Sequence, residues 1–309
     1  MSGGPAAAPP GGRLARLLAG GGFVVTGELV PPRSPDPAPV RRAARRLRGL
    51  VDAANVTDNA TARVGMSPLA AAALAAAEGL EPVLQLTCRD RNRLALTADL
   101  LGAHALGVRA VLCLSGDPMA VGGSDAAPVF DLDAVGLARL ATDLARGLGP
   151  AGEAIVPPAG LLVGVAEAPG ADPSGGGRLA AKVAAGARFV QTQPVYDVAQ
   201  FAGWLRRVAG RGLLERVAVL AGVLPPPSAA QLERLAGLPG WSVPAATVAR
   251  VRAARDQRAE GIALAAEVAA AVAELPGVRG VHLMGLGPAS GVPEVIEAAG
   301  LRPRAAAGS

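Results

Sequence analysis

The chain has 309 residues but little cysteine, few aromatic residues and no long apolar run. Its two cysteines, Cys88 and Cys113, are too few for a disulfide framework, and neither lies in a CxxC metal motif. This favours a reducing, cytoplasmic compartment. No apolar run reaches the roughly 20 residues that span a bilayer, so no membrane partner is predicted. Basic residues do not cluster with aromatics, which make up 2% of the chain, and this argues against a nucleic-acid partner.

The composition that remains is that of a globular protein. Hydrophobic residues make up 51% of the chain and charged residues 18%, whereas disordered chains are poor in apolar residues and highly charged. Lysine and arginine total 30, and Lys182 is the single lysine. So strong a bias toward arginine reflects overall composition, and the high isoelectric point therefore says little about partners.

Short β-branched runs alternate with helical stretches along the whole chain. The eight runs begin at Phe23, Ala53, Pro82, Ala110, Leu161, Arg188, Val217 and Val281. The spacing predicts helices over Ser67–Glu78, Arg93–Leu106, Leu132–Leu148, Ser174–Ala187, Gln231–Leu238 and Pro293–Ala299, with a longer helical region over Ala249–Glu274. Strands that alternate with helices in this way indicate a parallel sheet.

Eight βα units are the number that closes a (β/α)8 barrel of the TIM type. A doubly wound open sheet is the alternative, but it calls for a glycine-rich turn after the first strand, where this chain has ELVPPRSP. We therefore expect a single barrel domain over residues 21–301. We expect residues 1–20 to form a flexible leader that lacks the apolar core of a signal peptide, and 302–309 to form a flexible tail.

Polar residues recur late in five of the eight runs, two residues apart. They are Thr26 and Glu28, then Asn55, Thr57 and Asn59, then Gln85 and Thr87, then Ser115 and Asp117, and finally Gln191 and Gln193. Residues i and i+2 of a strand share a face, and barrel enzymes build their sites at the carboxyl ends of the strands. This pattern predicts a ligand site at that mouth. A glutamate there, such as Glu28, has the surroundings to raise its pKa and act as an acid.

The order of several short motifs resembles the methylenetetrahydrofolate reductase family. They are GELVPPR around Glu28, NVTDN around Thr57, LTCRDRNR around Thr87, LSGDP around Asp117, KVAAGARFVQTQPVYD from Lys182 to Asp197, GVLP at Gly222–Pro225, and GVHLMGLG before PEVIEAAGL. No single motif would suffice, since tripeptides such as GDP or TQP are common, but the order and spacing of the motifs from about Phe23 to Leu301 are specific. The resemblance implies a reductase barrel that carries FAD, takes hydride from NAD(P)H and reduces 5,10-methylenetetrahydrofolate to 5-methyltetrahydrofolate.

The resemblance also implies roles for single residues. Glu28 takes the position of the catalytic acid, and Asp117 that of the aspartate beside the flavin and the pterin. Substrate binding falls on Glu28, Asp117, Gln191 and Gln193. Cofactor binding falls on Thr57, Gln85, Thr87, Ser115, Gly116, Asp117, Glu167 and Lys182, with Lys182 serving the phosphates of the cofactor.

Four positions depart from the family pattern. Gln85 stands where a histidine is common, Ser115 where an arginine often precedes Gly-Asp, Glu167 and Ala168 where a flavin-stacking tyrosine is expected, and Pro288 where an arginine binds the folate tail. These changes keep alternatives open: a flavin-independent or partner-dependent reductase of a folate or pterin one-carbon unit, or a catalytically degenerate folate-binding barrel. A homo-oligomer or a partner subunit also stays open, whereas no motif predicts a metal.

Overall fold

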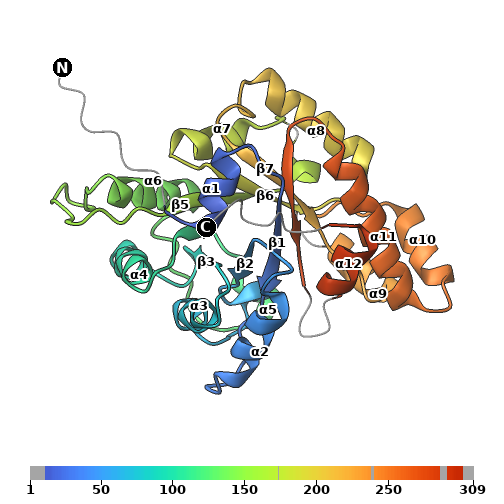
Figure 1. Ribbon diagram of the computed structural model, residues 1–309, viewed down its shortest axis with the longest axis horizontal. Coiled ribbons are helices and arrows are strands. Elements are labelled where there is room, and N and C mark those ends of the chain that lie inside the picture. Colours follow the sequence, from blue (N-terminus) through green and yellow to red (C-terminus); the bar gives the residue numbers. More distant parts are fainter. Residues whose placement is uncertain (1–10, 173, 238–239, 286–290, 302–309) are drawn as a thin grey trace.

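Eight parallel strands close into a barrel, and helices surround it (Figure 1). The computed structural model describes residues 11–172, 174–237, 240–285 and 291–301. The strands are β1 (Val24–Leu29), β2 (Ala53–Val56), β3 (Pro82–Thr87), β4 (Ala110–Leu114), β5 (Leu162–Glu167), β6 (Phe189–Pro194), β7 (Ala218–Val223) and β8 (Val278–Leu283). They pair in sequence order, and β8 pairs with β1. This confirms the (β/α)8 prediction over the doubly wound alternative.

The helices follow the strands as expected, with two differences. They are α1 (Arg13–Ala19), α2 (Ala38–Leu47), α3 (Pro68–Ala77), α4 (Arg93–Ala105), α5 (Met119–Gly122), α6 (Ala134–Ala145), α7 (Gly177–Ala184), α8 (Val198–Gly210), α9 (Ala229–Ala236), α10 (Ala245–Ala253), α11 (Gln257–Ala273) and α12 (Val292–Ala298), with 3-10 turns η1 (Ala60–Ala62) and η2 (Pro169–Ala171). The extra helical region predicted over Ala249–Glu274 is two helices, because the Asp256 side chain caps a new helix at Ala259 N–H. The second difference concerns α1.

Helix α1 lies within the segment that the sequence predicts to be a flexible leader. Leu14 is fully buried and packs with Ala15 against the lower interior of the barrel. The Glu81 carboxylate accepts hydrogen bonds from the backbone N–H groups of Arg13 and Leu14, at 2.6 and 3.0 Å. These are unpaired donors of a helix start, and an anionic acceptor there is favourable. The prediction of a flexible leader is therefore wrong for α1, which closes the amino-terminal end of the barrel.

The barrel interior is apolar in its lower half and polar in its upper half. The lower layer holds one side chain from most strands: Val24, Ala53, Val83, Ala110, Leu112, Leu162, Phe189 and Leu220. Gly164 makes room for the Phe189 ring, since a Cβ at Gly164 would lie 2.1 Å from that ring. Two residues farther along these strands, on the same face, come the polar side chains at the mouth. The alternation read from the sequence therefore places them inside the barrel.

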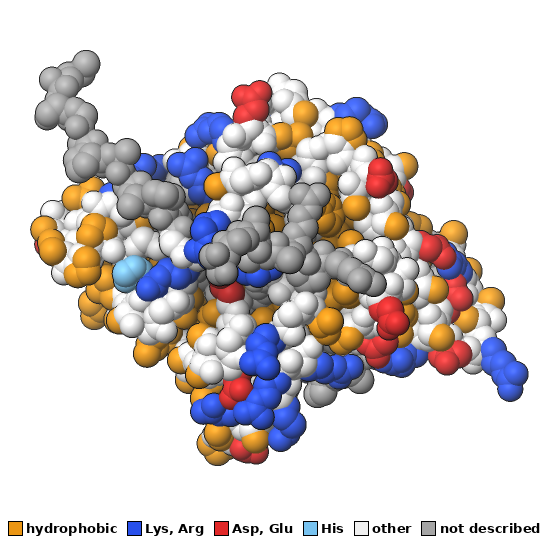
Figure 2. Space-filling view, viewed as in Figure 1, with side chains coloured by type: hydrophobic (Ala, Val, Ile, Leu, Met, Phe, Trp, Pro, Cys, Tyr) orange, Lys and Arg blue, Asp and Glu red, His pale blue; other side chains and the backbone are white. Residues whose placement is uncertain are grey.

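Some of the arginines on the surface form ion pairs with carboxylates. Figure 2 shows Lys and Arg side chains gathered over α2, and two of these, Arg41 and Arg45, contact Glu78 at 2.8 and 2.7 Å. Cys88 and Cys113 are both buried and free. Within the described ranges, no helix is long and apolar enough to cross a membrane, and no cluster of three or more His, Cys, Asp or Glu residues could hold a metal.

Candidate active site at the mouth of the barrel

A cavity of about 300 Å³ opens at the carboxyl ends of the strands. Most of the residues that the sequence predicts for the site line it: Glu28, Thr57, Gln85, Thr87, Ser115, Gly116, Asp117, Gln191 and Gln193. These come from β1, β2, β3 and β6 and from the loop after β4. Glu28 and Asp117 thus share one cavity although 89 positions separate them in the sequence. Its volume lies at the lower end of the range for small-molecule sites.

Glu28 is the ionisable group whose surroundings matter most. Its side chain is partly buried, and the Gly285 backbone N–H donates to Oε2 at 2.9 Å. Burial disfavours the carboxylate and raises the pKa from 4.5 to about 7, although the hydrogen bond from Gly285 lowers it. Glu28 therefore carries its proton through a large part of the neutral range, as a general acid must.

A hydrogen-bonded layer of polar side chains forms the floor of the cavity. Asn55 Nδ2 donates to Gln191 Oε1 at 2.6 Å, and Gln191 Nε2 donates back to Asn55 Oδ1 at 3.1 Å and to Thr26 Oγ1 at 3.4 Å. Because both ends of the Gln191 amide are engaged, its role here is to hold the floor. Of the two glutamines predicted to bind substrate, Gln193 is the one whose side chain has no hydrogen-bond partner within the described residues.

His282 completes the floor next to Thr26. Its Nδ1 lies 3.0 Å from Thr26 Oγ1, and burial lowers its pKa to about 3. A neutral imidazole has one donor and one acceptor nitrogen. With Thr26 Oγ1 donating to the Val281 carbonyl at 3.3 Å, Nδ1–H is the donor to Thr26, and Nε2 is left as an acceptor. This residue lines the cavity, and it is a site residue that the polar pattern of the strands did not single out.

Asp117 lies at the exposed edge of the cavity. Its Oδ2 accepts a hydrogen bond from the Thr61 N–H at 3.2 Å, which ties the loop after β4 to the loop after β2. Gly116 has a φ of +95°, and a Cβ there would lie 2.8 Å from the Arg89 side chain. Only glycine suits that conformation and that approach. Ser115 accepts from the Ala134 N–H at 3.2 Å and so helps to start α6.

The threonines and the remaining glutamine of the site differ in whether their side chains have hydrogen-bond partners within the protein. Thr57 Oγ1 is buried and has no hydrogen-bond partner. A buried unsatisfied hydroxyl costs about 1–3 kcal/mol, so a partner from a ligand is the natural explanation. Thr87 Oγ1 already donates to Asp58 at 2.9 Å. Gln85 is largely buried and, among the described residues, has no side-chain partner.

Two residues predicted to bind the cofactor lie outside the cavity lining. Lys182 Nζ donates to Glu167 Oε1 at 2.8 Å and to the Ala166 carbonyl at 2.6 Å, and both charged side chains are more than 90% buried. Ala166 lines the cavity, and Glu167, the next residue of β5, points to the opposite face. The structure therefore places Lys182 and Glu167 as an ion pair between β5 and α7. Pro288, the position of the missing arginine, lies outside the described residues.

The charged residues of LTCRDRNR hold the loops at the mouth, a role that the strand pattern does not predict. Arg89 is fully buried and donates to both carboxylate oxygens of Asp90, at 2.7 and 2.8 Å, and to the carbonyls of Asp117 and Asn59. Arg91 donates to Asp58 at 2.6 Å. These pairs fix the loops after β2, β3 and β4 against one another. The sequence did carry a signal for this role, because several charged residues follow directly after the apolar run of β3.

Comparisons with known proteins bear on the family and the fold of the chain. The model of the family described as methylenetetrahydrofolate reductase matches residues 13–300. An uncharacterised protein from Clostridium thermocellum that binds two copies of 5-methyl-5,6,7,8-tetrahydrofolic acid has a similar structure, with a TM-score of 0.67, 14% identity, and coverage of 93% of this chain and 98% of that one.

The match to a 2,3-dimethylmalate lyase has a TM-score of 0.49 and 14% identity, and it covers 92% of this chain and 82% of the lyase chain. This likeness is too weak to support an argument. No curated protein sequence matches significantly. The family match covers the whole barrel, α1 included, and with it every described residue of the mouth cavity. The chain therefore belongs to the methylenetetrahydrofolate reductase family.

Proposed function

We propose that this protein reduces 5,10-methylenetetrahydrofolate to 5-methyltetrahydrofolate with hydride from NAD(P)H. The observation that carries the proposal is a carboxyl group, Glu28, whose pKa burial raises to about 7, in one cavity with the unpartnered side chains of Gln193 and Thr57. A folate bound by a structural neighbour of the same fold is consistent with this substrate. A cytoplasmic location follows from the reducing environment that two buried, free cysteines favour.

The reaction needs a proton and a hydride. Glu28 gives its proton to N10 of the folate as the bond from the methylene carbon to N10 breaks, which leaves an iminium cation at N5. The ionised Glu28 then lies near that cation and stabilises it. Hydride adds to the methylene carbon, the iminium becomes the N5-methyl group, and NAD(P)+ is released. Gln193 Nε2 and Oε1 are suited to bind the polar edge of the pterin.

The family resemblance implies FAD as the carrier of the hydride, so we tested whether these residues suit its diphosphate. The predicted phosphate ligand, Lys182, is buried and neutralised by Glu167. Arg89, the one cation among the described residues that line the mouth cavity, uses its guanidinium on Asp90 and two carbonyls. Among the described residues, the cavity lining thus offers no free cation to a diphosphate, and a buried ion pair is costly to break. The residues present do not fit a tightly held FAD.

We therefore favour direct transfer of hydride from the nicotinamide ring. A co-substrate that binds and leaves in each turnover can keep its diphosphate in water. Exposed arginines suit such transient contact, and Arg33 and Arg63 lie on the loops after β1 and β2, at the mouth of the barrel. Thr57, with its orphan hydroxyl, and Asp117 then face the nicotinamide or the pterin instead of an isoalloxazine.

The deciding experiment is an absorbance scan of freshly purified protein followed by turnover with NADH or NADPH and 5,10-methylenetetrahydrofolate, with and without added FAD. We expect a colourless protein that turns over without FAD. Flavin bands, or turnover that depends on FAD, would refute the direct transfer but keep the reductase. A colourless protein without turnover under either condition would refute the reductase proposal and leave a folate-binding barrel.

A further inference from the structure

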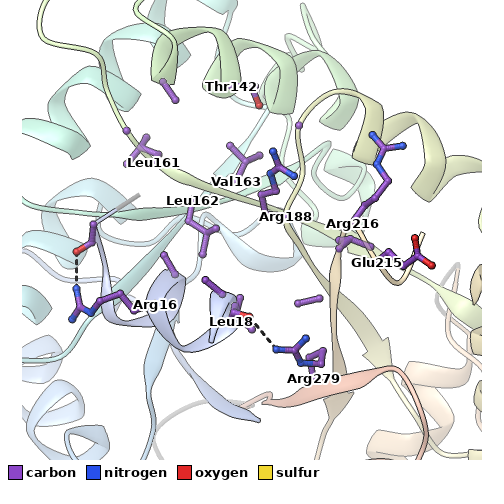
Figure 3. Close-up of a pocket in the computed structure, with 18 of the residues that line it drawn as sticks. Arg16, Leu18, Thr142, Leu161, Leu162, Val163, Arg188, Glu215, Arg216 and Arg279 are labelled. Atoms are coloured by element: carbon purple, nitrogen blue, oxygen red, sulfur yellow. Dashed lines mark hydrogen bonds between the residues drawn. The ribbon is translucent and has the colours of Figure 1, made fainter. Parts of the chain in front are cut away.

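A second and larger cavity, of about 860 Å³, lies at the opposite end of the barrel (Figure 3). It is bounded by α1, by the end of α6 and by the first residues of β5, β7 and β8. It shares no lining residue with the mouth cavity. Its size is within the range of small-molecule sites, which is about 300–1,000 Å³.

The floor of this lower cavity is apolar. Leu161, Leu162, Val163 and Val217 are buried at the amino-terminal ends of β5 and β7, and Leu18 faces them from α1 (Figure 3). An apolar floor of this kind gains free energy when the apolar part of a ligand covers it, at roughly 25 cal/mol per Å² removed from water. The cavity therefore suits an organic ligand better than a bare inorganic ion.

The rim of the lower cavity is strongly basic. Five arginines line it, Arg16, Arg146, Arg188, Arg216 and Arg279, together with one carboxylate, Glu215. Arg16 and Arg279 donate to the carbonyls of Gly11 and Leu18, both at 3.0 Å, so α1 holds two of the guanidinium groups in place (Figure 3). Arg146 lies 3.5 Å from Asp143 on its own helix.

Arg188 and Arg216 are different, because within the described residues neither guanidinium has a hydrogen-bond or ion-pair partner. Arg188 directly precedes β6, Arg216 lies two residues before β7, and both are exposed at the rim (Figure 3). Some exposed arginines are neutralised by nearby acids, as Arg250 is by Glu260 and Glu267, whereas Arg188 and Arg216 face one cavity together without such an acid as partner among the described residues. A cluster of like charges around one cavity repels itself, and a bound anion removes that repulsion.

We propose that the lower cavity binds a phosphorylated small molecule with an apolar body, such as a nucleoside triphosphate. Planar guanidinium groups bind phosphate oxygens in pairs, and this makes Arg188 and Arg216 the phosphate ligands. The apolar body lies on the floor between α1 and β5. The site is separate from the folate reduction at the mouth, so its existence does not depend on that activity.

The test measures ATP binding by isothermal titration calorimetry to the full chain, with tripolyphosphate and adenosine as half-ligands. We expect ATP to bind more tightly than either. The double substitution Arg188→Ala with Arg216→Ala should weaken ATP at least tenfold, and Arg42→Ala, which removes an exposed arginine of α2 outside the cavity, should not. Ala19→Trp should also weaken ATP, because Ala19 is exposed and lines the cavity, so that the indole occupies the space without entering the core.

Saturating 5-methyltetrahydrofolate, which carries no phosphate, should leave the ATP affinity unchanged, since the two cavities are at opposite ends of the barrel. We expect thermal unfolding midpoints close to that of wild type, which would establish that the variants are folded, because all four exchanged side chains are exposed. Equal affinity for ATP and tripolyphosphate would overturn the proposal, since it would mean simple attraction of anions. ATP affinity that stays the same in both the double variant and Ala19→Trp would also overturn it, and so would loss of ATP binding on addition of 5-methyltetrahydrofolate.

Discussion

The substitution Glu28→Gln tests the acid at the mouth through two independent measurements. Glutamine keeps the shape of the side chain, and its Oε1 can still accept the hydrogen bond from the Gly285 N–H. What it loses is the proton. General acid catalysis typically contributes about 10²–10⁴-fold to a rate, so we expect kcat for folate reduction to fall by about that factor.

The pH dependence follows from the raised pKa. The pKa of Glu28 is about 7 in the folded protein and 4.5 in the unfolded chain. Below pH 4.5 Glu28 is protonated in both the folded and the unfolded protein, so its ionisation does not lower the unfolding free energy. As pH rises toward 7 the unfolded chain ionises first, so the folded state loses stability. The loss is complete above pH 7, and it reaches at most about 3 kcal/mol at 1.36 kcal/mol per pKa unit.

Glutamine does not ionise, so Glu28→Gln should escape this loss. The difference in unfolding free energy between the variant and wild type should therefore depend on pH. We expect this difference to be about 2 kcal/mol more favourable to the variant at pH 8 than at pH 5. Urea denaturation at the two pH values measures the difference. In wild type, kcat/KM should also fall as pH rises through about 7, and this fall should be absent from the residual activity of the variant.

Glu274→Gln is the matched control, because Glu274 is exposed at the end of α11 and far from the mouth in the fold. It should change neither turnover nor the pH dependence of stability. Near-normal folate turnover in Glu28→Gln would refute the role as proton donor. An equal stability difference at pH 5 and pH 8 would refute the raised pKa, whatever the activity shows.

Three further substitutions test other parts of the structure. Lys182→Met should lower the unfolding free energy by about 3–5 kcal/mol, because it leaves Glu167 buried and unpaired. Adding Glu167→Leu should restore most of the lost stability. A loss of nucleotide binding with unchanged stability would instead support the phosphate role implied by the family. Leu14→Ala should cost about 2–5 kcal/mol in urea denaturation, since the side chain is fully buried, whereas a loss near zero would mean that α1 is a loose leader after all. Thr57→Val should keep or raise stability, by up to about 1 kcal/mol, while it raises KM for the folate or the nucleotide; unchanged KM values for both would mean that no ligand meets the orphan hydroxyl.

Much of the fold could be predicted from the chain because its signals are local and periodic. Eight β-branched runs, each followed by a helical stretch, indicate a closed parallel barrel by number alone. Period-2 alternation then places Glu28, Gln85 and Gln193 on the inner face at the carboxyl ends. The same rule, applied to Glu167 one residue after the inward Ala166, would have placed that carboxylate outside the barrel.

Only the tertiary structure decided which partner each polar group meets. Gln191 is tied to Asn55, 136 positions away, and Lys182 meets Glu167 because α7 packs on β5 at that level. The role of α1 depends likewise on Glu81, a residue of a distant loop whose carboxylate caps the helix. The pKa of Glu28 depends on how completely several strands and loops exclude water from the mouth. Sequence periodicity fixes the face on which a side chain lies, but the strength and partner of its interactions depend on neighbours that only the closed barrel brings together.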